Sequence, residues 1–298
     1  MGACIHDGWL AIDNLKEEIN QDFLYWVLIS SQKHLEKLAP TGTQRNLNIG
    51  LVSAFQIPVP PLPEQECIVA TLDAVEELRR LREQADRCTG DLIPAIFHEM
   101  FGDPATNPKG WNMSRLGDVT CIDALMVDPR QEEYRNLPHV GAEQIIKKTG
   151  ELLPTKTAAE DMLISGKYLF DAQHVLYSKI RPYLRKAALV EGQGLCSADV
   201  YPVHPDKSKM TREFLWSVLL SDSFTDYTTT VSTRANMPKI NRKQFEAYEI
   251  ILPPLSFQYD YTARVAEIRA MQAQQAQSRD LLDNLFKSLL HNAFFGDL

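Results

Sequence analysis

The chain has 298 residues, of which 44% are hydrophobic, and a formal net charge of −8 at pH 7; this length gives room for about two domains of ordinary size with hydrophobic cores. No apolar stretch reaches the roughly 20 residues that a membrane span needs, and the N-terminus lacks the basic and apolar regions of a signal peptide. Five scattered cysteines without a Cys-x-x-Cys motif argue against a disulfide framework or a zinc ribbon. We therefore expect a cytoplasmic protein with no membrane partner.

Several short motifs occur twice in the same order, separated by about 190 residues. The repeated segments are 23–30 with 214–221, Pro60-Pro61-Leu62 with Pro253-Pro254-Leu255, and Phe101-Gly102-Asp103 with Phe295-Gly296-Asp297. Cys4 and Asp7 correspond in the same way to Cys196 and Asp199. The pattern predicts a duplicated unit of which the first copy, residues 1–61, contains only the latter part of a globular domain.

Two long helices are predicted from apolar residues at spacings of three and four, one from about Leu62 to Phe101 and one from about Leu255 to Phe295. Pro94 should kink the first, because proline lacks a backbone N–H. A duplicated unit with a globular insertion brings its helices together, so we expect an antiparallel coiled coil, with a single bundle core as the alternative. The predicted packing residues are Ile68, Leu72, Val75, Leu78, Leu92, Val265, Ile268, Leu281, Leu285 and Leu289.

The segment between the two helices, residues 104–254, has the features of one complete globular domain. Residues 175–177, 187–190 and 248–252 are typical of strands, with Arg181-Pro182 interrupting the first two. Thr211 is expected to cap a helix at 214–220, and Asn20 to do the same in the first copy. Mixed short strands and helices predict an α+β fold.

Motifs for catalysis are missing from the sequence. It contains no phosphate-binding loop, no dinucleotide-binding fingerprint, no His-Glu-x-x-His and no Gly-x-Ser-x-Gly. The seven histidines are dispersed, and Asp199 is interpreted as a structural residue because Asp7 repeats it. We therefore assign no catalytic residue and no metal site.

Two stretches of the 104–254 domain are rich in basic residues and contain no acidic one. We name residues 172–190 the first basic stretch and residues 228–245 the second basic stretch. Lysine and arginine neutralise phosphates, whereas arginine, asparagine and hydroxyl side chains can also contact base edges; ordinary solvated loops are the alternative. The candidate DNA contacts are Tyr177, Ser178, Lys179, Arg181, Arg185, Lys186, Thr233, Arg234, Asn236, Lys239, Arg242 and Lys243.

With these features in view, the chain resembles the specificity subunit of type I restriction-modification enzymes over essentially its whole length. The resemblance rests on the order of four motif-bearing segments together with the duplication. They are 57–65, which opens the first long helix, and 110–119, 140–152 and 175–182 in the globular domain. The second copy departs from the pattern at Ser256-Phe257, where the first has Pro63-Glu64.

The resemblance implies a non-catalytic subunit that recognises a bipartite sequence in double-stranded DNA. It implies a target recognition domain at 104–254, a remnant of another at 1–61, and conserved spacer helices at 62–103 and 255–298. The implied partners are methyltransferase (M) and restriction (R) subunits, which bind S-adenosylmethionine, ATP and Mg, so no cofactor is expected in this chain.

Complete family members carry two whole recognition domains, whereas this sequence carries one and a fraction. The departure favours a second hypothesis. In it the chain is a scaffold that forms a homodimer or docks methyltransferase subunits without binding DNA by itself.

Overall fold

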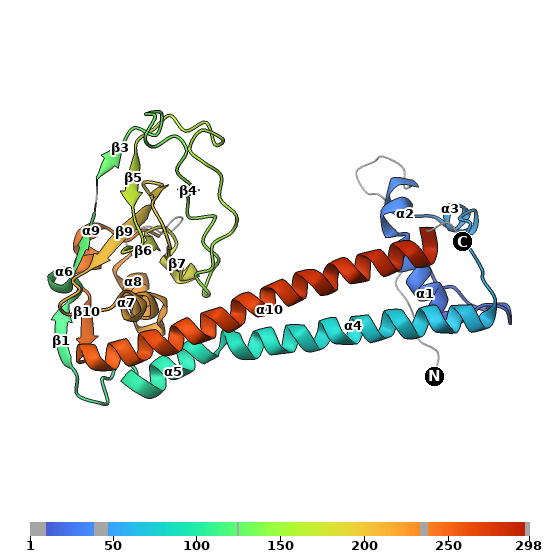
Figure 1. Cartoon of the computed structure of the whole chain (residues 1–298), viewed down its shortest axis with the longest axis horizontal. Helices are drawn as coiled ribbons and strands as arrows, with labels where there is room; N and C mark the ends of the chain where they lie inside the picture. Colours follow the sequence, from blue (N-terminus) through green and yellow to red (C-terminus); the bar gives the residue numbers. More distant parts are fainter. Residues whose placement is uncertain (1–9, 39–46, 124, 233–237, 296–298) are drawn as a thin grey trace. The chain divides into compact units, whose positions relative to one another are not determined.

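The computed structural model describes residues 10–38, 47–123, 125–232 and 238–295, and the chain divides into two units (Figure 1). The first unit combines residues 1–87 with residues 273–298, and the second comprises residues 88–272. Helix α10, Leu255–Phe295, belongs to the second unit at its start and to the first unit at its end. Helices and short strands together give the α+β fold that the sequence predicts.

The described part of the first unit is helical. Its elements are α1 (Gln21–Ser30), α2 (Gln32–Leu38), α3 (Ile49–Ser53), α4 (Leu62–Gly90) and the end of α10. Phe23 and Trp26 of α1 are buried against Leu72 of α4 and Phe294 of α10, forming the core of this unit. The Trp26 indole also donates a hydrogen bond of 2.9 Å to Asp73, which fixes α1 on α4.

Within the first unit, α4 and α10 run antiparallel, as the helix-pair prediction expects. The Arg79 Nε atom lies 2.9 Å from Asp283 Oδ1, and Arg279 Nη1 lies 2.8 Å from Asp86 Oδ2. Residue numbers therefore rise along α4 while they fall along α10. The Arg79 guanidinium also lies 4.6 Å from the centre of the Phe286 ring, so charged groups share this seam with apolar ones.

The packing prediction is correct for part of the seam and wrong for the rest. Ile68, Leu72, Val75, Val265, Ile268 and Leu289 are buried or packed against a hydrophobic cluster. Leu78, Leu92, Leu281 and Leu285 are exposed. The face of α4 that starts at Leu72 and Val75 continues through Arg79 and Asp86, which bond to α10. Arg79 thus occupies the place in the seam that the prediction gave to Leu78.

The predicted helix from Leu62 to Phe101 is interrupted, because α4 ends at Gly90 and α5 spans Leu92–Phe101. Pro94 lies in the first turn of α5, where a missing backbone N–H removes no helical hydrogen bond. Two helices separated at Asp91, before the proline, therefore replace the single helix with a kink at Pro94 that the sequence predicts.

The described residues of the second unit form two four-stranded sheets and a two-stranded pair. Its remaining elements are β1 (Asn112–Arg115), α6 (Leu116–Val119), β2 (Thr120–Ile122), β3 (Met126–Val127), β4 (His139–Val140), β5 (Lys167–Phe170), β6 (Val175–Ser178), η1 (Pro182–Leu184), β7 (Ala187–Leu189), β8 (Gly194–Cys196), β9 (Val200–Pro205), α7 (Arg212–Leu220), α8 (Asp222–Val231), α9 (Arg242–Glu246) and β10 (Glu249–Leu252). The strand orders are β1-β10, β2-β9-β6-β7 and β3-β5-β8-β4.

Strand β6 is buried on both faces, since successive side chains of a strand point in opposite directions. Val175 and Tyr177 pack in the cluster that contains α7 and the start of α10, whereas Leu176 packs with residues of the other four-stranded sheet. The sheet β2-β9-β6-β7 is therefore the middle layer of the second unit.

A buried glutamine occupies the same place in both copies of the repeat. Gln258 Oε1 accepts a hydrogen bond of 2.9 Å from the Thr211 backbone N–H, and its Nε2 donates to the carbonyl groups of Lys209 and Pro253. Gln65 makes the corresponding bond of 2.9 Å with Asn20.

Asn20 and Thr211, the two residues bonded by these glutamines, cap helices as predicted. The Asn20 side chain accepts from backbone N–H groups of α1, and the Thr211 side chain accepts from that of Phe214 in α7. Shared caps and shared glutamine bonds give the sequence repeat a structural counterpart.

Candidate nucleic-acid interface

The first basic stretch lies beside the described residues from 238 onward of the second, although the sequence separates them. The Arg181 backbone N–H donates a hydrogen bond of 2.7 Å to the Pro238 carbonyl, and the Ile240 N–H donates one of 3.0 Å to the Lys179 carbonyl. An antiparallel bridge between Ile180 and Lys239 lies between these bonds. The backbone thus joins the first basic stretch, just after β6, to the second, just before α9.

Asp199 lies among the lysines of this junction. Its Oδ1 atom is 3.8 Å from Lys179 Nζ and 3.5 Å from Lys239 Nζ. Burial and the neighbouring Lys239 lower the pKa of Lys179, which also lies 5.1 Å from the centre of the Tyr201 ring. Asp199 therefore compensates part of the positive charge at this junction.

The side chains that remain accessible at the junction are few. Arg181 and Lys243 are exposed, and the Lys239 side chain is 40% exposed. Arg242 donates to the Ile122 carbonyl and lies 3.7 Å from Glu246, so its guanidinium is partly engaged within the chain. Arg181, Lys239, Arg242 and Lys243 therefore keep exposed side chains at the junction, Lys239 beside Asp199 and Arg242, 47% exposed, beside Glu246.

Two further basic candidates are engaged within the chain. The Arg185 guanidinium forms an ion pair with Asp222 at the beginning of α8. The Lys186 ammonium donates a hydrogen bond of 2.6 Å to the Ala142 carbonyl. These side chains support the loop between β6 and β7 and have less freedom to contact a ligand.

The prediction of DNA contacts is wrong for Tyr177 and Ser178. Tyr177 is 1% exposed and packs against the rings of Phe224 and Phe245, and burial raises the pKa of its hydroxyl. Ser178 is also 1% exposed and donates to the Ile180 carbonyl. Both belong to the core because β6 is covered on its two faces. Thr233, Arg234 and Asn236 lie outside the described residues.

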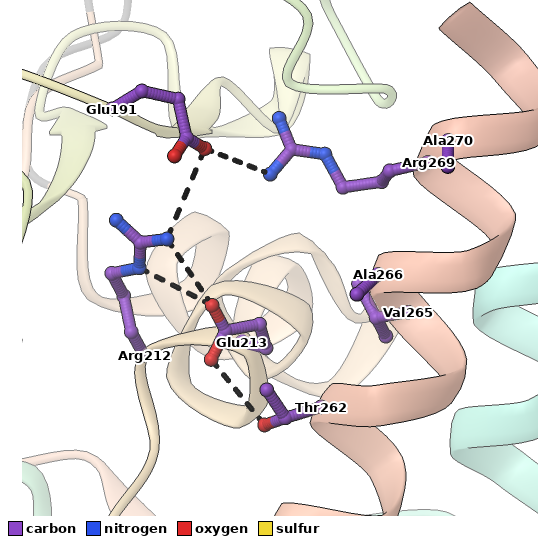
Figure 2. Close-up of a pocket in the computed structure, with 8 residues that line it drawn as sticks. All are labelled: Glu191, Arg212, Glu213, Thr262, Val265, Ala266, Arg269 and Ala270. Carbon is purple, nitrogen blue, oxygen red and sulfur yellow. Dashed lines mark hydrogen bonds and ion pairs between the residues drawn. The ribbon is translucent and has the colours of Figure 1, made fainter.

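A separate pocket of about 400 Å³ lies between the beginning of α7 and α10 (Figure 2). Arg212 is 3.3 Å from Glu213 and 3.9 Å from Glu191, and Arg269 is 3.7 Å from Glu191. The lining is completed by Thr262, Val265, Ala266 and Ala270. Its charges compensate one another, and the lining offers no nucleophile paired with a base. Glu191, in the loop after β7, therefore links Arg212 of α7 to Arg269 of α10.

Other kinds of site find no support in the part of the chain that the structure describes. No group of three or more histidine, cysteine, aspartate or glutamate side chains there is arranged to hold a metal ion. Among the described helices, none combines the length and the apolar character that a bilayer crossing demands.

Comparison with known proteins gives relatives over nearly the whole chain. The type I restriction enzyme EcoDI specificity subunit of Escherichia coli is 28% identical over 318 residues, which covers 94% of this chain and 70% of that protein. The S subunit structure of the type I restriction-modification system from M. genitalium covers 94% of this chain and 74% of its own, with 16% identity and a TM-score of 0.58.

A chain of a structure on complex assembly and conformational transition of the type I R-M system has 22% identity and a TM-score of 0.53, and covers 93% of this chain and 68% of its own. At these identities the two structures show a shared fold.

The family model described as the type I restriction modification DNA specificity domain matches residues 7–86 and 108–266, once in each copy of the repeat. The chain belongs to this family of type I restriction-modification specificity subunits.

Proposed function

We propose that the second unit contacts one half of a bipartite sequence in double-stranded DNA through Arg181, Lys239 and Lys243. The observation that carries this proposal is the backbone pairing of the two basic stretches, which gathers exposed positive charge at one place in a chain with a net charge of −8. Guanidinium groups can contact guanine in two hydrogen bonds, whereas lysines mainly neutralise phosphates. Arg181 is therefore assigned to a base and the lysines to the backbone.

As a specificity subunit, the chain is non-catalytic. In the complex that we propose, methyltransferase subunits bind S-adenosylmethionine, and a restriction subunit binds ATP and Mg. The cytoplasmic location stays a prediction.

Replacing Lys239 by alanine should weaken binding to duplex DNA at low salt and make it less sensitive to salt. Each phosphate neutralised by a protein cation contributes about 0.9 to the slope of log affinity against log salt concentration. We expect the slope to fall by about that amount on a 30-base-pair duplex of random sequence, measured by fluorescence anisotropy of the full chain over a salt series.

Asp199→Asn is the matched variant of opposite sign, because it removes a negative charge from between two lysines. It should raise the affinity and steepen the slope. Lys37→Ala, an exposed lysine on α2 of the first unit, should leave both unchanged. Identical slopes for all three variants and the natural chain would contradict the assignment of phosphate contacts to this junction.

A second candidate function, the scaffold, is favoured by α1. Tyr25 is 56% exposed and Ile29 is 41% exposed, whereas Trp216, which corresponds to Tyr25 in the repeat, is 5% exposed. The Trp216 indole donates a hydrogen bond of 2.9 Å to the Ala187 carbonyl of β7. The face of α1 that carries Tyr25 and Ile29 therefore has no equivalent cover among the described residues, whereas its other face is buried on α4 and α10. Such an exposed apolar face is typical of a surface that meets another polypeptide.

Co-expression of the full chain with its methyltransferase subunit, followed by mapping of methylated adenines across the genome, separates the two functions. Methylation at a defined sequence that depends on Arg181 supports DNA recognition. A stable complex that methylates no defined sequence and protects no duplex supports the scaffold.

A further inference from the structure

The loop between β6 and β7, residues 179–186, is held in one shape by backbone bonds to three separate segments. Its beginning bonds to Pro238, as described above, and the Lys179 N–H donates a hydrogen bond of 2.9 Å to the Asp199 carbonyl. Its end is held by the Lys148 N–H, which donates 2.9 Å to the Arg185 carbonyl. We name this segment the β6–β7 loop.

The β6–β7 loop contains two arginines in a backbone conformation that favours glycine. Arg181 has φ 48° and Arg185 has φ 50°, and between them Pro182–Leu184 form the short helix η1. Pro182 is buried, and α8 packs against this turn. Residues held in the left-handed region cluster where a site needs a fixed geometry, so the strain at both ends of the turn indicates that its shape serves a function.

The side chains at this turn divide into two groups. Those of Arg185 and Lys186 are bonded to Asp222 and to the Ala142 carbonyl, within the protein. The side chains of Arg181 and Tyr183 are exposed, Tyr183 by 51%, and these side chains form no hydrogen bond or ion pair with any residue in the described ranges. A single exposed aromatic residue is ordinary, but this one stands two residues from an exposed arginine on a turn that the backbone holds fixed.

We propose that Tyr183 is a DNA-contacting residue that packs its ring against the base or sugar next to the base contacted by Arg181. The inference rests on the proposed function and extends it to a residue outside the three charge-based contacts. A tyrosine ring is flat and amphipathic and loses little conformational freedom on binding. In a duplex the faces of the bases are stacked, so the ring packs against a sugar or against the exposed edge of a base, such as the methyl group of thymine. Because the backbone of the turn is already formed, it holds the Cα atoms of Arg181 and Tyr183 at a fixed separation when the turn enters the groove.

The test is a selection of bound duplexes from a library with randomised sequence, using the full chain alone and in complex with its methyltransferase subunit. The variants are Tyr183→Ala and Tyr183→Phe, with Tyr259→Ala as the control. Tyr259 is 58% exposed at the beginning of α10 in the same unit.

We expect Tyr183→Ala to bind the selected sequence about tenfold more weakly, in line with the loss of one contact to the edge of a base, and to lose preference at positions beside the Arg181-dependent base. Tyr183→Phe should stay within about twofold of the natural chain, because the ring face makes the contact. Tyr259→Ala should match the natural chain. All three variants should melt like the natural chain, because both tyrosines are exposed.

Two results would overturn the inference, and they differ from each other. If the natural chain selects a sequence and Tyr183→Ala selects the same sequence with equal affinity, the tyrosine has no role and the proposed function stands. If the natural chain selects no sequence, either alone or with its methyltransferase subunit, the proposed function fails and this inference fails with it.

Discussion

Replacing Arg181 by glycine should abolish most of the preference for one base while leaving the second unit as stable as before. A bidentate contact from arginine to a base contributes about 1–3 kcal/mol to discrimination, so affinity for the target should fall by a factor of about 5 to 150. Glycine relieves about 1–2 kcal/mol of strain at φ 48°, which offsets the additional chain entropy of about 0.5–1 kcal/mol that glycine loses on folding. The measurements are duplex-binding isotherms and thermal unfolding of the same samples.

Arg185→Gly is the matched control for this variant, because Arg185 has nearly the same backbone conformation but its guanidinium faces Asp222. It should keep the base preference of the natural chain. Arg181→Ala completes the set, since it removes the guanidinium and keeps the strain, so it should be less stable than Arg181→Gly and equally weak in binding. Equal loss of binding in the Arg185 and Arg181 variants would show that the turn acts only through its shape.

Local signals in the sequence predict the helices and their ends well. Asn20 and Thr211 cap helices as their side chains suggest, because a capping side chain bonds to backbone groups two or three residues away. The glutamine bonds of the repeat join residues 45 to 49 positions apart. The helix seam is predicted less well. Hydrophobic periodicity favours Leu78, but Arg79 lies in the seam, where its charged end meets Asp283 and its guanidinium lies over a ring.

The candidate interface shows a different limit of sequence reasoning. Charge segregation identifies both basic stretches, but no local pattern shows that Arg181 bonds to Pro238, which lies more than 50 residues away. Tyr177 stands beside basic residues in the sequence and yet is buried, because a second layer covers the other side of its strand. Which arginine faces solvent likewise depends on Asp222, a tertiary neighbour of Arg185.

Gln258→Met should destabilise the second unit more than any surface substitution, because the buried side chain makes three hydrogen bonds to the backbone. Gln258 is 0% exposed and bonds to Thr211, Lys209 and Pro253 at 2.9, 3.0 and 2.8 Å. Methionine fills a similar volume but leaves these groups unpaired, and each buried unpaired group costs about 1–3 kcal/mol. We expect a loss of roughly 3–5 kcal/mol in the free energy of unfolding, measured by chemical denaturation.

The repeat supplies the control for this loss. Gln65→Met removes the corresponding bonds in the first unit, so hydrogen exchange should speed up in α1 for that variant and in α7 for Gln258→Met. Gln274→Met, at an exposed position of α10, should change neither helix. Exchange that rises equally in α1 and α7 for both buried variants would show that the two units unfold together, and the glutamines would then stabilise one cooperative structure instead of two separate helix caps.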